Sequence, residues 1–119
     1  MKIVQIGERN PELIQKLLDV WESSVKATHL FLSVDEFDNI KQYVPQALKD
    51  IPVLVVAENI NGDPEGFMGV ADKMLEMLFI SNECRGQGIG KQLLQYGIEN
   101  YSINEQGSPY PLLYMKRNP

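Results

Sequence analysis

The sequence has very few of the residues that build disulfides and metal sites. Among 119 residues it contains one cysteine, Cys84, and one histidine, His29. A single cysteine excludes an intramolecular disulfide, and one cysteine with one histidine cannot complete a closed zinc site. We therefore expect a chain without disulfides that works without a metal.

Long apolar runs and an excess of positive charge are also missing. No segment approaches the roughly 20 apolar residues that a membrane helix needs, and residues 1–4 lead directly into polar sequence, unlike a signal peptide. The formal net charge is −5, whereas a general nucleic-acid surface would be basic. We expect a cytoplasmic protein that binds neither membranes nor nucleic acid, and the charge favours a cationic or neutral substrate.

Strand and helix patterns succeed one another without linkers or repeats. Helices are expected from Pro11, after the capping-box pattern at Ser33, and from Ile89, with a kink or break at Pro45. Strands are expected over 2–6, 53–57, 66–70, 75–80, 101–103 and 112–115. This order predicts an α/β (α+β) fold, with one mixed sheet flanked by helices in a single domain over residues 1–119.

The most distinctive segment is the glycine-rich turn at 85–90, Arg-Gly-Gln-Gly-Ile-Gly, between a strand and a helix start. Glycines let the backbone approach an anion closely, and free N–H groups at a helix N-terminus point toward it. The spacing is not that of a dinucleotide-binding loop, and Gln92 stands where a Walker loop needs Ser or Thr. The turn therefore predicts a phosphate site of another kind.

The pattern of residues 85–90 resembles the acyl-CoA-binding motif of the GNAT superfamily of N-acetyltransferases. The likeness extends to the helix with Trp21, the link 28–32 and the ending 107–115, as in a small bacterial branch of that family. The resemblance implies a mostly antiparallel sheet and direct acetyl transfer from acetyl-CoA to a primary amine of a small molecule or a peptide or protein N-terminus. The residues implied to hold the cofactor are Leu78, Phe79, Ile80, Arg85, Gly86, Gln87, Gly88, Ile89, Gly90, Lys91 and Asn104.

Glu76 is the candidate general base, because alternate strand residues share a face and Glu76 would then lie beside Leu78 and Ile80. The alternative is a solvated glutamate on a polar strand surface. The residues implied for the acceptor side are Trp21, Thr28, His29 and Phe31, with core packing as the competing interpretation for Trp21. Cys84 adjoins a helix N-terminus, which could lower its pKa, but we expect a bystander.

The chain departs from the family pattern between Glu105 and Gln106. A helix bearing the usual general-acid tyrosine, and the strand after it, have no counterpart there, so the C-terminal part of the fold is expected to be truncated. A naturally short family member, a deletion and an omitted segment would all give this sequence. The alternative function is then an acyl-CoA-binding module with weak or no catalysis. An exposed sheet edge predicts a homodimer.

Overall fold

A computed structural model describes residues 1–28 and 33–103 of the chain. The described elements are, in chain order, β1 (Lys2–Gln5), α1 (Pro11–Thr28), α2 (Val34–Asp50), β2 (Val53–Glu58), β3 (Pro64–Ala71), β4 (Met74–Ile80), the short 3₁₀ helix η1 (Asn82–Cys84) and α3 (Ile89–Tyr101). None of the described helices is both long enough and apolar enough to cross a membrane.

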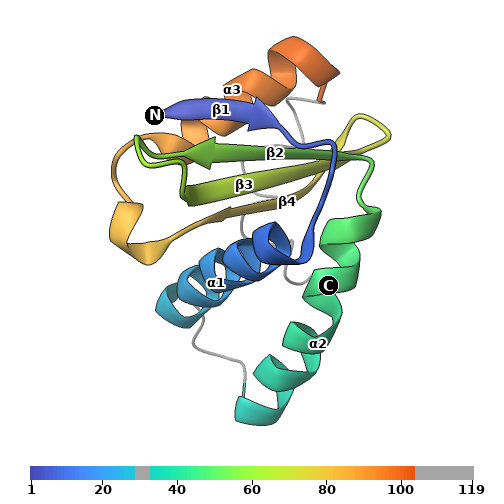
Figure 1. The fold of residues 1–119 in the computed structure, drawn as a ribbon, viewed down its shortest axis with the longest axis vertical. Coiled ribbons are helices and arrows are strands. Elements are labelled where there is room, and N and C mark those ends of the chain that lie inside the picture. Colours follow the sequence, from blue (N-terminus) through green and yellow to red (C-terminus); the bar gives the residue numbers. More distant parts are fainter. Residues whose placement is uncertain (29–32, 104–119) are drawn as a thin grey trace.

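The sheet has the strand order β1-β2-β3-β4, and each neighbouring pair is antiparallel. Helices α1 and α2 lie on one face of the sheet, and α3 lies on the other (Figure 1). The predicted α/β (α+β) class, with helices flanking a mostly antiparallel sheet, is therefore confirmed.

Alternation along the strands divides the core into two clusters, one on each face of the sheet. On β2, Leu54 and Val56 pack with α1 and α2, whereas Val55 and Ala57 pack with α3. All four are fully buried. A strand buried on both faces reads as a continuous apolar run, which is the pattern that predicted this strand.

The register between β3 and β4 shifts within β4. Gly69 pairs with Met77 and Val70 pairs with Leu75, so Glu76 is an extra residue without a partner on β3. Such a bulge changes which side chains share a face. Leu75, Leu78 and Ile80 pack in the cluster beneath α3, whereas Met77 and Phe79 pack in the cluster with α1 and α2. The alternation from Met77 to Ile80 is therefore regular, and the expectation that Glu76 shares a face with Leu78 and Ile80 stays a prediction.

At the start of β4, the side chain of Met74 is 59% exposed, whereas Met77 and Phe79 pack against the cluster with α1 and α2. Two residues before β4 turn the chain sharply, since Asp72 and Lys73 both have positive φ. Met74 follows this tight hairpin directly and stays at its exposed end.

The first two helices begin with side-chain caps. The Asn10 Oδ1 atom accepts a hydrogen bond from the Leu13 N–H at 2.8 Å. At α2, the Ser33 hydroxyl accepts from the Glu36 N–H, and the Glu36 carboxylate accepts from the Ser33 N–H, forming the predicted capping box. Pro45 does not divide α2, which continues to Asp50.

Arg9, which lies between β1 and α1, donates hydrogen bonds to the C-terminus of α2. The Arg9 Nη1 group donates to the carbonyl oxygens of Leu48, at 3.0 Å, and Lys49, at 3.1 Å, and also to that of Ile51. The last carbonyl groups of a helix accept no hydrogen bond within the helix. Arg9 satisfies them and joins the β1–α1 connection to the end of α2.

The strand expected over 101–103 is not formed. Tyr101 is the last residue of α3, and Ser102 ends the helix in the left-handed conformation, with φ of 56°. The Tyr101 ring lies 6.0 Å from the Tyr96 ring on the preceding turn, and its hydroxyl donates to Gln5 on β1. These contacts hold Tyr101 in the helix. The strand expected over 112–115 and Asn104 lie outside the described residues.

Candidate cofactor and acceptor site

The glycine-rich turn connects η1 to α3, as the sequence predicted. Gly86 and Gly88 have φ angles of +80° and +79°, in the left-handed region that favours glycine. Gly88 is the N-cap residue of α3 and has no side chain to bond the free N–H groups. The sequence places glycine where other helices of this chain place a capping side chain.

The first N–H groups of α3 are free to bind a ligand. The first helical hydrogen bond runs from the Gln92 N–H to the Gly88 carbonyl, at 3.0 Å, so the N–H groups of Ile89, Gly90 and Lys91 precede it and have no acceptor within the helix. Residues 86–88 are exposed, and a Cβ placed on Gly86 would meet nothing within 4 Å. An anion can therefore reach these N–H groups.

Two cations lie beside this helix start, and they are oriented differently. Lys91 is exposed in the first turn of α3, which contains no acidic residue. The Arg85 guanidinium instead donates to the hydroxyl and carbonyl oxygens of Ser24 on α1, at 3.2 and 3.4 Å. Neither cation is in any ion pair found in the described part of the chain. Lys91 can therefore offer its charge to a phosphate, whereas Arg85 connects the turn to α1.

Gly66 on β3 allows α3 to lie close to the sheet, a role that the sequence analysis did not assign. A Cβ on Gly66 would lie 2.7 Å from the Ile80 Cδ1 atom and 3.3 Å from the Ile89 Cγ2 atom. Ile89, the first residue of α3, is buried in this contact. A glycine inside an apolar strand often marks such a close approach, and this was the available signal.

The outer edge of β4 has no partner among the described strands. The Ser81 N–H donates to the Glu65 carbonyl at 2.9 Å, so the backbone of residue 81 points toward β3. Backbone groups of successive residues alternate in direction along a strand. The N–H and carbonyl groups of Leu78 and Ile80 therefore point to the open edge, whereas those of Phe79 point to β3.

The remaining predicted residues fall in different surroundings. Glu76 is exposed, at the bulge upstream of Leu78. Trp21 is only 4% exposed and its ring stacks on Phe37 at a centroid distance of 5.3 Å, which confirms the core-packing interpretation. Thr28 is the last residue of α1. His29 and Phe31 lie outside the described residues.

Cys84 is not an activated nucleophile. Burial raises the pKa of its thiol, and the nearby Glu65 carboxylate raises the pKa further. The expectation that the adjoining helix start lowers this pKa is thus opposite to what the surroundings produce, because the thiol is partly buried beside a negative charge. The bystander interpretation of Cys84 agrees with this.

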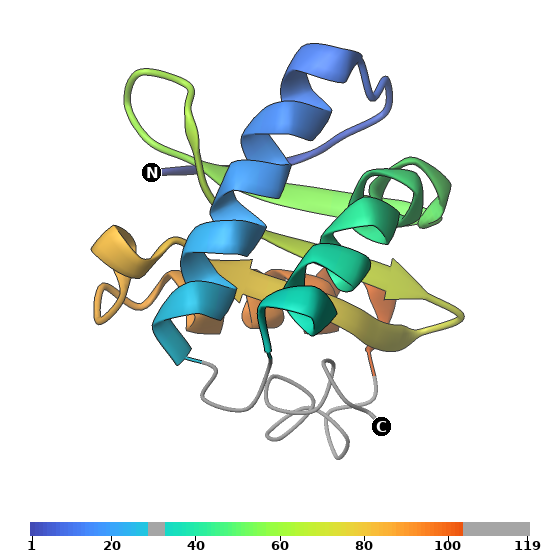
Figure 2. The same ribbon diagram turned by 90° about the horizontal axis from the view of Figure 1, so that it is seen from below.

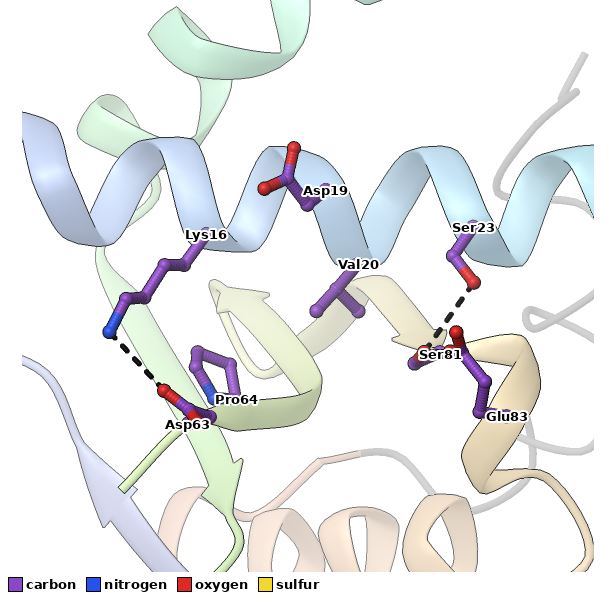
Figure 3. Close-up of a pocket in the computed structure, with 8 residues that line it drawn as sticks. All are labelled: Lys16, Asp19, Val20, Ser23, Asp63, Pro64, Ser81 and Glu83. Atoms are coloured by element: carbon purple, nitrogen blue, oxygen red, sulfur yellow. Dashed lines mark hydrogen bonds and ion pairs between the residues drawn. The ribbon is translucent and has the colours of Figure 1, made fainter. Parts of the chain in front are cut away.

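A pocket of about 310 Å³ lies along α1, outside the residues that the sequence singled out. Its lining comes from α1, the start of β3 and the segment after β4, and consists of Lys16, Asp19, Val20, Ser23, Asp63, Pro64, Ser81 and Glu83 (Figure 3). Lys16 and Asp63 form an ion pair across it at 3.4 Å. Residues 1–28 and 33–103 contain no group of three or more side chains that could hold a metal ion.

An uncapped helix start beside an open strand edge is a site suited to a cofactor with a phosphate group and an extended arm. Comparison with known proteins gives the class: a model of the acetyltransferase (GNAT) domain matches residues 50–118. The chain belongs to the GNAT family and is an N-acetyltransferase of that family.

Two relatives and one structural neighbour illustrate the family. The chain is 33% identical to the peptidyl-lysine N-acetyltransferase YjaB of Salmonella typhimurium, over 96% of this chain and 81% of the relative. It resembles the solution structure of YjaB from Escherichia coli with a TM-score of 0.72 at 33% identity, over 83% of this chain and 66% of the other. An aminoglycoside 6'-N-acetyltransferase in complex with coenzyme A shares the fold, with a TM-score of 0.61 at 19% identity, over 86% of this chain and 56% of the other.

Proposed function

We propose that this chain transfers the acetyl group of acetyl-CoA to a primary amine, and that residues 1–119 act as one acetyltransferase domain. The observation that carries the proposal is the uncapped N-terminus of α3 next to the open edge of β4. The GNAT domain match and the coenzyme A bound to the aminoglycoside acetyltransferase support acetyl-CoA as the cosubstrate.

The pyrophosphate of the cofactor would bind the backbone N–H groups of residues 87–91. These groups carry the partial positive charge of the helix N-terminus, and Lys91 adds a full charge. Gly86 and Gly88 give the backbone its shape there, Ile89 anchors the helix start on the sheet, and Arg85 fixes the turn from the α1 side.

The pantetheine arm would lie along β4 as an added strand. The backbone groups of Leu78 and Ile80 point to that edge and would bond the amide groups of the arm, while Phe79 keeps its bonds to β3. Asn104 lies outside the described residues, and the family resemblance implies that it also bonds the arm. This arrangement directs the thioester toward the upstream half of β4, where Glu76 lies.

Glu76 would act as the general base. The amine nitrogen attacks the thioester carbonyl, the amine proton passes to the carboxylate, and the carbon–sulfur bond breaks to release the CoA thiolate. The thiolate is a good leaving group, so the step does not depend on a tyrosine acid. Bulges are frequent next to active sites because they redirect a side chain, which supports an active role for the residue at this bulge.

The acceptor is proposed to be a lysine side chain of a peptide or protein, with small amines and peptide N-termini as the other candidates. The name of the YjaB relatives, peptidyl-lysine N-acetyltransferase, supports this choice. Thr28, His29 and Phe31 are proposed to line the acceptor side, whereas the buried Trp21 would support it from the core.

The proposal is tested in two stages. Calorimetric titration with acetyl-CoA measures cofactor binding, and thiol release with a panel of lysine peptides and small amines measures transfer. Glu76→Gln should leave acetyl-CoA binding unchanged and lower the turnover rate. An unchanged turnover rate would remove Glu76 from the mechanism, and binding without release on any amine would favour an acyl-CoA-binding module.

We also propose that the chain forms a homodimer. The sequence predicts an exposed sheet edge at the last strand, which lies outside the described residues. Light scattering during size-exclusion chromatography should give twice the chain mass at micromolar concentration. A monomer would contradict it.

A further inference from the structure

Two adjacent serines of α1 contact the segment that leads into the glycine-rich turn. The Asn82 N–H donates to the Ser23 hydroxyl at 2.9 Å, and the hydroxyl groups of Ser23 and Ser81 lie 3.4 Å apart (Figure 3). The Arg85 guanidinium donates to the Ser24 hydroxyl at 3.2 Å. These contacts join residues 59 and 61 positions apart in sequence.

The segment before the turn has short-range bonds of its own: the Cys84 N–H donates to the Ser81 carbonyl, the Arg85 N–H to the Asn82 carbonyl, and the Ser81 hydroxyl to the Glu83 carboxylate. Helix η1 is three residues long, and its N-cap residue, Ser81, makes no side-chain capping bond to it. Ser23 supplies the missing acceptor from a different element. Ser24 is 5% exposed and is the one polar residue that is buried in the described part of the chain. A buried hydroxyl that receives an arginine is a fixed point for the turn.

Between Arg85 and the buried Ile89 the turn has few neighbours. A Cβ on Gly86 would meet nothing within 4 Å, and one on Gly88 would meet the Gln92 Nε2 atom at 4.0 Å. Both glycines have left-handed conformations, and a glycine without contacts readily leaves such a conformation. A ligand that binds such N–H groups gains affinity when their orientation is fixed beforehand. The two serines fix it at Asn82 and Arg85, on the α1 side of the turn.

We propose that Ser23 and Ser24 are positioning residues of the cofactor site, which hold the glycine-rich turn in the geometry that receives the cofactor phosphates. This inference rests on the proposed function. It makes α1, the helix that leads into the acceptor link at 28–32, part of the cofactor site as well.

The test compares a ligand with phosphates and a ligand without them. Ser23→Ala, Ser24→Ala and the double variant are titrated with coenzyme A, and with pantetheine by displacement. The double variant loses two hydrogen bonds and should bind coenzyme A about 30-fold more weakly, which corresponds to about 2 kcal/mol. Pantetheine binding should change less than about 2-fold, since it does not reach the turn. Ser23→Thr, which keeps the hydroxyl, should restore coenzyme A affinity.

Ser33→Ala is the matched control, because it removes a serine hydroxyl that contacts α2 alone among the described elements. It should leave both affinities unchanged. Ser23 is only partly buried, so Ser23→Ala stays folded and carries the test if the double variant does not. Equal coenzyme A affinity in wild type and variants would overturn the inference, as would an equal loss for pantetheine. Failure of the wild type to bind coenzyme A would instead contradict the proposed function.

Discussion

The starts of α2 and α3 meet the same physical problem in opposite ways. Both helices have N–H groups without acceptors in their first turn. At α2, Ser33 and Glu36 satisfy two of them from within the chain, and Asp35 adds negative charge. At α3, the cap is Gly88, the first turn has no acid, and Lys91 adds positive charge. At α2 the side chains of the helix itself supply acceptors, whereas at α3 the first N–H groups have no acceptor within the helix.

The contrast shows what distinguishes a binding turn from a structural one. A glycine at an N-cap is not unusual by itself. At α3 it is combined with left-handed backbone at Gly86 and Gly88 and with open space at Gly86. The edge of β4, which has no partner among the described strands, leads toward this turn (Figure 2). The combination supports a ligand site where each feature alone would not.

The largest effect is expected when the start of α3 is given the cap it lacks. Gly88→Asp supplies a carboxylate that accepts from the free N–H groups and repels the cofactor phosphates. Aspartate tolerates left-handed backbone better than most residues. We expect coenzyme A affinity, measured by calorimetry, to fall about 100-fold or more, close to 2.7 kcal/mol, while the melting temperature is kept.

Gly62→Asp is its control. Gly62 has φ of +85° and open space around it, and it lies in the β2–β3 turn, not at a helix start. This variant also places an aspartate at a positive φ angle and adds the same charge. It should nevertheless bind coenzyme A with the affinity of the wild type. If Gly88→Asp also binds normally, the phosphates do not contact the start of α3.

The converse change removes a cap that is present. Ser33→Ala deletes the acceptor of the Glu36 N–H, which lies 3.1 Å from the Ser33 hydroxyl. The free energy of unfolding should fall by about 1 kcal/mol, seen as a lower midpoint in urea. Ser33→Asp, which keeps a capping oxygen, should recover most of it. A loss of coenzyme A affinity in folded Ser33→Ala would show that the two helix starts are not independent.

The smallest effect is expected from the ion pairs of Glu22, one of which links α1 to α2. The Glu22 carboxylate lies 2.8 Å from the Lys41 Nζ atom and 2.9 Å from the Lys26 Nζ atom, and these hydrogen bonds, that of Lys41 first, lower the pKa of Glu22. Its contribution to stability is present at neutral pH and is lost as pH falls through the folded-state pKa. Glu22→Gln should cost about 0.5 kcal/mol at neutral pH, with cofactor binding unchanged.

Urea unfolding at two pH values checks the sign. Below the folded-state pKa the wild type also loses the ionised pair, so the difference between Glu22→Gln and wild type should disappear. A difference of the same size at both pH values would assign the effect to packing between α1 and α2.

The sequence could predict those features of the fold that depend on neighbouring residues. The caps at Asn10 and Ser33, the strands β2 to β4 and the glycine-rich turn were predicted because each depends on residues adjacent in the chain. The bulge at Glu76 was not predicted, because a bulge depends on the partner strand, which no short pattern contains. Tyr101 was misassigned because its partners, Tyr96 and Gln5, hold it in the helix.

The same reasoning applies within the site. Gly88 and Lys91 were identified from the motif, because a helix start is a local feature. Ser23, Ser24 and Gly66 were missed, since their contacts cross from α1 or β3 to a distant part of the chain. The motif thus predicted the position of the proposed anion site, and the fold shows which contacts hold its backbone.

The arginine that closes α2 also has a consequence for the order in which the chain folds. Arg9 and its acceptors Leu48 and Ile51 are separated by 39 and 42 positions. Such a contact forms only after a long loop has closed, a cost that local helix formation does not bear. We therefore expect the Arg9 contacts at the end of α2 to form late, when the N-terminal strand has joined the sheet. In hydrogen exchange, the amides of the last turn of α2 should report on the docking of residues 2–9 rather than on the helix itself.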